Sequence, residues 1–301
     1  MSPRAKRVLA ALVPGLPYAW LALFFLVPFG ITLKISLSDP VLAQPPYLPL
    51  LDWSAGFTGW RDFLEALDFA NYALLAEDEL YWRAALSSVR IAAAATAILA
   101  LVGLPFALAM ARAPRRWQPL LVALVVVPFW TSFLIRVYAW TAILRPDGLL
   151  DRALAGLGLP PAGLLNSEPA VLLGLVYTYL PFMVLPLYAV LERMDGRLVE
   201  AARDLGARPA TAFLTVTLPL ALPGLGAGAL LCFIPMVGEF VVPDLLGGSD
   251  TLMIGRVLWS EFFSNRDWPL AAAVAVLLLV LVLGPLVLFR EVAARRLERA
   301  S

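Results

Sequence analysis

Long apolar stretches recur along this 301-residue chain and limit what it can fold into. A helix of about 20 apolar residues is long enough to cross the hydrocarbon core of a bilayer. Six such stretches lie at about 16–38, 84–111, 118–144, 169–191, 216–238 and 268–290. With a mean hydropathy of +0.83, the chain is too apolar for a soluble protein of this length. The sequence therefore predicts an all-α polytopic membrane protein with six transmembrane helices, most simply one domain over residues 1–301.

The composition excludes several kinds of chemistry. The chain has no histidine, which removes histidine metal sites and the Ser-His-Asp and Cys-His forms of catalysis. Cys232 is the only cysteine, so an internal disulfide framework cannot form. Neither GxxxxGK[ST] nor GxGxxG occurs, and we therefore expect no nucleotide-binding loop within this chain.

The charged residues predict which way the chain crosses the membrane. Cationic residues form four clusters that share one side if the chain crosses six times: Arg4, Lys6 and Arg7; Arg112, Arg115 and Arg116; Arg193, Arg197, Arg203 and Arg208; Arg290, Arg295, Arg296 and Arg299. The positive-inside rule then places both termini and the loop 192–216 in the cytoplasm.

The first of these clusters precedes an apolar run, as in a signal peptide. However, Tyr18–Leu37 is long enough to span the membrane, so we expect this helix to be retained in the mature protein. The outer segment 39–83 has apolar residues at helical spacing, which predicts helices on the outer surface.

The loop 192–216 carries the signals of a short helix followed by a second one. Asp195 can cap the first helix, Gly206 stands where a C-terminal glycine would end it, and Pro209 suits the first turn of the next. Four residues at i, i+3, i+4 and i+7 form an apolar stripe, namely Leu198, Ala201, Ala202 and Leu205. Such a helix suits docking into a groove of a partner, and the alternative is a helix lying on lipid headgroups.

At these residues the chain resembles a known family. Glu200-Ala201-Ala202, then Gly206, then Val216-x-Leu218-Pro219 is similar to the E-A-A-x3-G-x9-I-x-L-P signature of ABC importer permeases, with valine in place of isoleucine. The resemblance implies a type I importer permease fold and a coupling helix that docks on an ATP-binding subunit dimer. The residues it assigns to coupling are Glu200, Ala201, Ala202, Asp204, Gly206, Leu218 and Pro219. ATP and Mg would belong to that partner, with no cofactor in this chain.

A narrower resemblance concerns the solute. Val126–Leu150 and Gly238–Phe263 are similar to the permease subunits of spermidine/putrescine importers. This implies a bacterial inner-membrane protein that works with a second permease subunit, most simply a different chain, and with an extracytoplasmic substrate-binding protein. It further implies that the chain is a transport subunit and that ATP is hydrolysed by its partner.

A polyamine path needs carboxylates near the amines and aromatic faces against the amines and methylenes. The candidate residues are Glu239, Asp244, Trp130, Phe133, Tyr138 and Trp140. Each has a structural alternative: Glu239 can pair with Arg136 or cap a turn near Pro243, and Asp244 can be a turn residue. The aromatic residues can form an interfacial belt or pack between helices. Acids further along, Asp250, Glu261 and Asp267, can dock a binding protein or remain solvated loop charges.

Two rival functions remain open from the sequence. The first is an ABC importer permease for another solute, such as thiamine, iron or an anion, although an anion path is disfavoured by Glu239 and Asp244. The second is an intramembrane enzyme. Without histidine it would need a Ser–Lys or Asp–Asp pair, and Lys6 and Lys34 are the only lysines, with no paired membrane aspartates.

Overall fold

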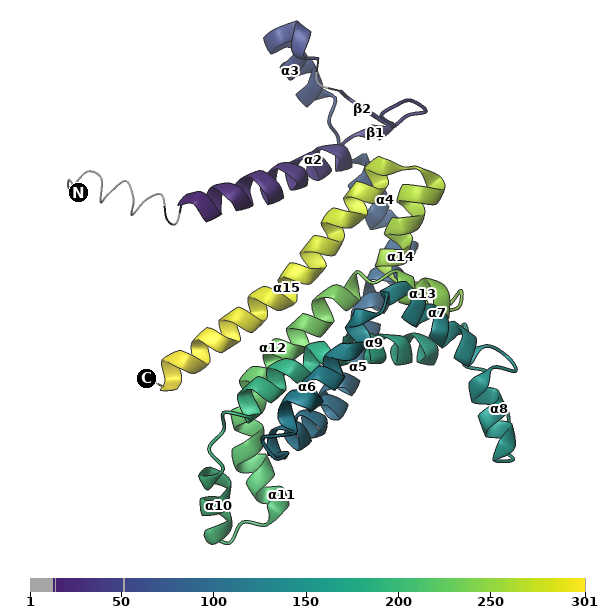
Figure 1. The fold of residues 1–301 in the computed structure, drawn as a ribbon. Coiled ribbons are helices and arrows are strands. Elements are labelled where there is room, and N and C mark those ends of the chain that lie inside the picture. Colours follow the sequence, from purple (N-terminus) through teal and green to yellow (C-terminus); the bar gives the residue numbers. More distant parts are fainter. Residues whose placement is uncertain (1–12, 14, 51, 301) are drawn as a thin grey trace, which may run out of the picture. The chain divides into compact units, whose positions relative to one another are not determined.

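A computed structural model of the chain describes residues 13, 15–50 and 52–300 (Figure 1). Its contacts divide into two compact units. The first combines Met1–Trp82 with Leu258–Leu281, and the second combines Arg83–Val257 with Val282–Ser301. The N-terminal cluster of Arg4, Lys6 and Arg7 lies outside the described residues, as do the side chains of the C-terminal arginines.

The elements are almost all helical. In chain order the first unit holds η1 (Ala22–Leu26), α2 (Val27–Ser36), β1 (Asp39–Pro40), β2 (Tyr47–Leu48), η2 (Trp53–Ala55), α3 (Gly56–Glu65), α4 (Ala70–Glu77), η5 (Ser260–Asn265) and the start of α15 (Trp268–Ala300). The second holds most of α5 (Glu79–Arg112), α6 (Gln118–Val126), η3 (Val127–Trp130), α7 (Phe133–Leu144), α8 (Leu149–Gly156), α9 (Glu168–Leu191), α10 (Arg197–Asp204), α11 (Pro209–Ala212), η4 (Phe213–Thr217), α12 (Leu218–Val237), α13 (Val241–Leu246) and most of α14 (Ile254–Trp259).

Four of the described helices are long and apolar enough to cross a membrane: Gly15–Ser36, Glu79–Arg112, Glu168–Leu191 and Pro209–Val237. They confirm the apolar helices predicted at 16–38, 84–111, 169–191 and 216–238. Trp268–Gly284, the apolar part of α15, is shorter. The expected number of six spans therefore stays a prediction.

The segment 118–144 corrects the expectation of one helix. Gln118–Trp130 and Phe133–Gly156 are separate helical stretches bent by 88°. Between them Thr131 and Ser132 have extended ψ angles of 152° and 136°. Pro128 lies in the short 3₁₀ turn before the break and lacks a backbone N–H, so the helical ladder is already weakened there. These two stretches form a fifth candidate span only if a helix pair with such a bend is treated as a single span.

The core of the second unit lies where α9 meets α12. Two glycines of α12 allow close approach, because a β-carbon on Gly228 would lie 2.9 Å from Met183 Sδ and one on Gly224 would lie 2.9 Å from Pro186 O. Small residues four apart are a common way for membrane helices to pack backbone against backbone. The packed pair α9 and α12 thereby fixes the chain on both sides of α10, which lies between them in sequence, and before α13, which follows α12.

Replacing Gly228 with valine should break this packing. The added atoms would collide with the backbone of α9, and overpacking of this kind typically costs about 1–3 kcal/mol. We expect less folded protein and a lower unfolding temperature in detergent, measured by fluorescence-detected size exclusion after heating. Ala227→Val is the control, since Ala227 lies next along α12 on its exposed side. Equal stability of the two variants would contradict the packing role of Gly228.

The outer segment 39–83 contains α3 and α4, which confirms the helices expected there. Within the first unit Asn71 Nδ2 donates to the carbonyl oxygens of Ser36 and Ser38, at 3.1 and 2.9 Å. Glu261 is buried, and its carboxylate accepts from Tyr81 Oη at 3.3 Å and from Asn265 Nδ2 at 2.8 Å. The expectation that Glu261 is a docking or solvated charge is therefore wrong, because its carboxylate is buried and bonded within this unit.

Candidate functional site

The loop 192–216 folds into the two helices that its sequence predicts, although the N-cap of α10 is Gly196 and not Asp195. Asp195 Oδ1 accepts from the Arg197 N–H at 3.0 Å, which satisfies one free donor at the start of α10. At the other end Gly206 has φ +86°. Its N–H donates to Arg203 O at 2.9 Å, and the Ala207 N–H donates to Ala202 O at 3.0 Å. These two bonds make up a Schellman cap, which confirms Gly206 as the residue that ends the helix.

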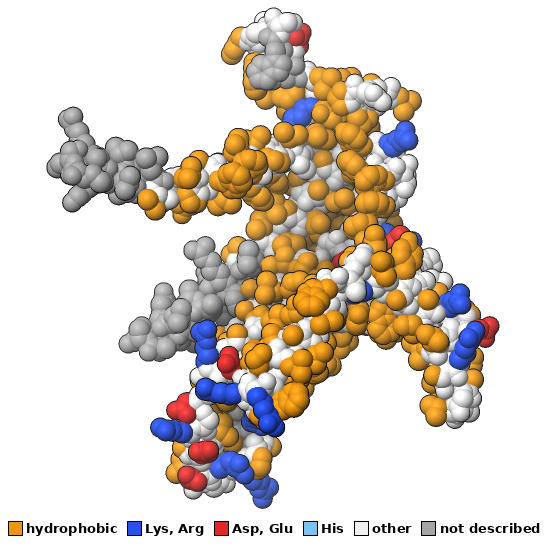
Figure 2. Space-filling model, viewed as in Figure 1, with side chains coloured by type: hydrophobic (Ala, Val, Ile, Leu, Met, Phe, Trp, Pro, Cys, Tyr) orange, Lys and Arg blue, Asp and Glu red, His pale blue; other side chains and the backbone are white. Residues whose placement is uncertain are grey.

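The apolar stripe of α10 has no cover within the described chain. Leu198 is 48% exposed and Leu205 is 89% exposed. Figure 2 shows charged side chains gathered over α10 and α11, whereas hydrophobic side chains dominate the surface next to them. An exposed leucine stripe flanked by charges fits either reading from the sequence, a docking surface or a helix lying on lipid headgroups.

Leu218 and Pro219 open α12, directly after the π-helical turn η4. Pro219 has no N–H to continue the normal helical ladder. The helix Pro209–Val237 passes through this turn without a break, so α11, η4 and α12 form one continuous helical stretch.

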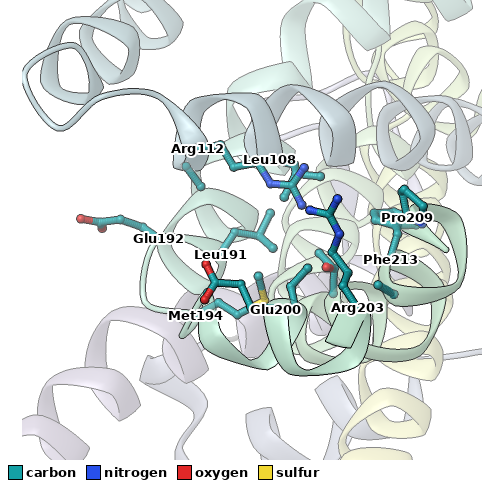
Figure 3. A pocket seen from close by; sticks show the side chains of 14 residues that line it. Leu108, Arg112, Leu191, Glu192, Met194, Glu200, Arg203, Pro209 and Phe213 are labelled. Atoms are coloured by element: carbon teal, nitrogen blue, oxygen red, sulfur yellow. The ribbon is translucent and has the colours of Figure 1, made fainter. Parts of the chain in front are cut away.

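Behind α10 lies a cavity of about 460 Å³, here called the α10 cavity (Figure 3). It is lined by the ends of α5 and α9, by α10, and by α11 with η4. The lining residues are Leu108, Ala111, Arg112, Leu191, Glu192, Met194, Gly196, Val199, Glu200, Arg203, Pro209, Ala212, Phe213 and Thr217. Glu200 thus lies on the cavity side of α10, whereas Leu198 and Leu205 do not line the cavity.

Glu239 follows α12 and takes part in three hydrogen bonds. Its Oε1 accepts from the N–H groups of Phe240 and Val241, at 3.2 and 3.0 Å, at the start of α13. Its Oε2 accepts from Tyr179 Oη of α9 at 2.9 Å. The capping alternative for Glu239 is therefore realised, and pairing with Arg136 is not. The side chain is half-buried, so part of it remains reachable.

Asp244 lies in the first turn of α13 and forms an ion pair with Arg256, with Oδ1 and Nε 3.1 Å apart. Arg136 has no such partner among the described residues. Its Nε and Nη1 atoms are buried and make no hydrogen bond there, and its guanidinium lies over the rings of Phe129 and Phe133 at 5.1 and 5.9 Å.

Comparison with known proteins decides the class. Residues 103–299 match the family described as "binding-protein-dependent transport system inner membrane component". The chain belongs to this permease family. It is therefore a multi-pass inner-membrane protein and a transport subunit, as the resemblance at the loop 192–216 implied.

Individual relatives extend the match. The permease is 40% identical over 267 residues to the spermidine/putrescine transport system permease protein PotB of Haemophilus influenzae, covering 88% of this chain and 87% of the other. It is 42% identical over 231 residues to PotB of Escherichia coli, covering 76% and 83%. The molybdenum transport system permease protein ModB of Mycobacterium bovis is 35% identical over 208 residues, covering 68% and 76%.

A solved structure confirms the fold. The permease aligns with a chain of a bacterial alginate ABC transporter in complex with an alginate pentasaccharide-bound periplasmic protein, with a TM-score of 0.68 and 17% identity. The alignment covers 95% of this chain and 96% of the other. The bend between η3 and α7 thus belongs to a chain with the overall fold of ABC transporter permeases.

The aromatic candidates of the permease do not form one cluster with Glu239. Trp130 and Tyr138 are 82% and 58% exposed. Trp140 is half-buried and packs edge-on against Tyr177 of α9, with ring centroids 5.4 Å apart. Phe133 lies beneath Arg136. None of these four takes part in the hydrogen bonds of Glu239.

The residue that sequence reasoning missed is Tyr179. It lies in α9, is 7% exposed, and supplies the one side chain that hydrogen-bonds to Glu239 in the described structure. The only hint in the sequence was a tyrosine hydroxyl within an apolar span, which needs a hydrogen-bond partner when it is buried. Pairing it with Glu239, 60 residues further along the chain, requires the packing of α9 on α12 and α13.

Proposed function

We propose that this permease imports spermidine and putrescine. The observation that carries the proposal is its 40–42% identity to PotB proteins over most of its length. The molybdenum permease ModB is less similar, at 35%, and matches a shorter part of the chain. An acidic residue near the end of an apolar helix, as at Glu239, also suits a cationic solute better than an anionic one.

The proposed transport complex has several subunits. An extracytoplasmic binding protein delivers the polyamine, two permease subunits form the path between them, and an ATP-binding subunit dimer supplies the energy. ATP and Mg are held by that dimer. Both termini of this chain lie in the cytoplasm, in keeping with the positive-inside rule.

Coupling is assigned to the loop 192–216. The leucine stripe of α10 docks in a groove of the ATP-binding subunit, with Ala201 and Ala202 allowing close approach and Asp204 on the charged flank. Glu200 and Gly206 set the orientation and the end of the helix, and Leu218-Pro219 passes the motion to α12. The exposure of Leu198 and Leu205 supports this assignment.

The path is assigned to Glu239 first. Its carboxylate is held in place by Tyr179 and by the start of α13, which orients it for an ammonium group. Trp130, Phe133, Tyr138 and Trp140 contribute aromatic faces. Asp244 contributes less, because Arg256 already compensates its charge. Arg136 is only partly covered and has no ion-pair partner among the described residues, so the reachable part of its guanidinium suits an acidic group of the second permease.

The test is uptake of labelled spermidine into proteoliposomes that hold this chain with its co-encoded subunits. We expect saturable, ATP-dependent uptake that excess putrescine blocks and that thiamine, ferric iron and molybdate do not. Liposomes loaded with ADP in place of ATP are the control. ATP-dependent uptake of another solute would keep the coupling assignment and discard the polyamine assignment.

A further inference from the structure

The α10 cavity faces a side of α10 that the docking of the leucine stripe does not use. Gly196, Val199, Glu200 and Arg203 line it, at positions i, i+3, i+4 and i+7 of one helical face. The same short helix therefore presents one face outward and another to a partly open cavity of about 460 Å³. A space of this size can hold a small polar group.

A buried hydroxyl without a partner lines this cavity. Thr217 is fully buried, and its Oγ1 makes no hydrogen bond in the described structure. A threonine in a helix ordinarily bonds back to the carbonyl four residues earlier, as Thr215 does to Thr211 O at 2.8 Å. Thr217 ends the π turn η4, a type of irregularity that often marks functional sites. A buried hydroxyl without a protein partner points to a bound group.

Two guanidinium groups meet at the same cavity. Arg112 comes from the last turn of α5 and Arg203 from α10, and Figure 3 shows their heads pointing toward one another. Neither forms an ion pair or hydrogen bond with a described residue. Glu192 and Glu200 also line the cavity, but Figure 3 shows Glu192 directed away from both arginines. Two convergent guanidinium groups, in a cavity that a hydroxyl also lines, match the paired oxygen atoms of a phosphate group.

The surroundings of the cavity resemble a membrane interface. Arg112 is followed by Arg115, Arg116 and Trp117, and the Arg116 guanidinium lies 5.8 Å from the Trp117 ring. Basic residues and tryptophan of this kind gather at the level of lipid headgroups. Basic pockets between transmembrane helices on the cytoplasmic side bind anionic headgroups.

We propose that the α10 cavity binds a phosphate group, held by Arg112, Arg203 and the Thr217 hydroxyl, with an anionic phospholipid as its main source. The inference rests on the proposed function in one respect, because that function places this loop in the cytoplasm. The bound headgroup ties the end of α5 to α10. It thereby makes the position of the coupling helix sensitive to the anionic lipid content of the inner leaflet.

The test measures lipid directly on the resting complex, without ATP or polyamine, so its result is independent of transport. The full complex is purified in detergent, titrated with phosphatidylglycerol or phosphatidylcholine, and retained lipid is counted by native mass spectrometry. We expect one phosphatidylglycerol retained per copy of this chain. Affinity should fall about thirtyfold in Arg112→Gln/Arg203→Gln, since each basic residue near an anionic headgroup contributes a factor of about five.

Two further variants sharpen the result. Arg115→Gln/Arg116→Gln also removes two positive charges, both from the cluster that contains Arg112, but it alters no residue that lines the cavity. It should therefore lose no more than about threefold in affinity. Thr217→Val keeps shape and charge and should weaken retention about fivefold, as expected for one hydrogen bond. A parallel titration with inorganic phosphate at constant ionic strength separates the sources: binding of phosphate without competition by phosphatidylglycerol would assign the site to free phosphate.

Three results would overturn the proposal. The first is binding of neither probe. The second is an equal loss of phosphatidylglycerol in the two arginine pairs, which would indicate general surface charge. The third is unchanged retention in Thr217→Val, which would remove the hydroxyl from the proposed set of three ligands and so contradict the site as proposed.

Discussion

Replacing Gly206 with valine is expected to lower ATP-driven uptake by about tenfold or more while ATP hydrolysis continues. At φ +86° a β-carbon on this residue would meet no atom within 4 Å, so the cost comes entirely from the backbone. The left-handed conformation costs a non-glycine residue about 1–2 kcal/mol, and a β-branched residue is the least suited to it. The Schellman cap would open and α10 would lose its fixed end. The measurement is uptake and ATPase rate on the same proteoliposomes.

The chain offers a closely matched control. Gly158 ends α8 at φ +73° with open space around its β-position, and the same pair of hydrogen bonds closes that helix. Gly158→Val therefore carries a similar strain away from the coupling loop, and it should leave the ratio of uptake to ATP hydrolysis unchanged. Gly206→Asn should retain most uptake, because asparagine tolerates this conformation. Normal coupling in Gly206→Val, or equal uncoupling in both valine variants, would rule out the coupling role.

Local chemistry explains why the loop was predictable. Three local signals shape this loop, and each acts over only a few residues, so the sequence indicates them directly. They are the turn at Asp195, the left-handed Gly206 and Pro209, which opens α11. The apolar helices were predictable for a similar reason, since their length and composition suffice. The bend at Thr131 and Ser132 was not, because a proline near a helix is as often tolerated as it is disruptive.

The surroundings of Glu239 depended on tertiary packing. The sequence suggested a capping role or a partner at Arg136, and only the packing of α9 and α12 shows Tyr179 beside the carboxylate. Glu261 was misjudged for the same reason: its hydrogen bond to Tyr81 joins residues 180 positions apart. Charge in a loop predicts exposure on average, but a carboxylate with two side-chain donors can be buried at low cost.

Replacing Glu239 with glutamine is expected to reduce spermidine uptake at least about tenfold while the complex still assembles. The amide oxygen can still accept from the N–H groups of Phe240 and Val241, and the amide nitrogen can donate to Tyr179 Oη. The geometry is therefore kept and only the negative charge is lost. A hydrogen bond to a charged group contributes about 1.5–3 kcal/mol, which corresponds to a factor of about ten or more.

Two variants separate charge from structure in this result. Asp244→Asn removes a carboxylate that is already paired with Arg256 at 3.1 Å and partly exposed, so uptake should change less than about threefold. Tyr179→Phe keeps the Glu239 charge and removes one of its donors, so it should lower the uptake rate less than Glu239→Gln does. The KM and the maximal rate are measured for each variant in proteoliposomes with matched amounts of complex. An unchanged KM and maximal rate in Glu239→Gln would show that this carboxylate serves only as a helix cap. The substitution keeps every hydrogen bond of the cap and removes only the negative charge, which is what an ammonium group would recognise.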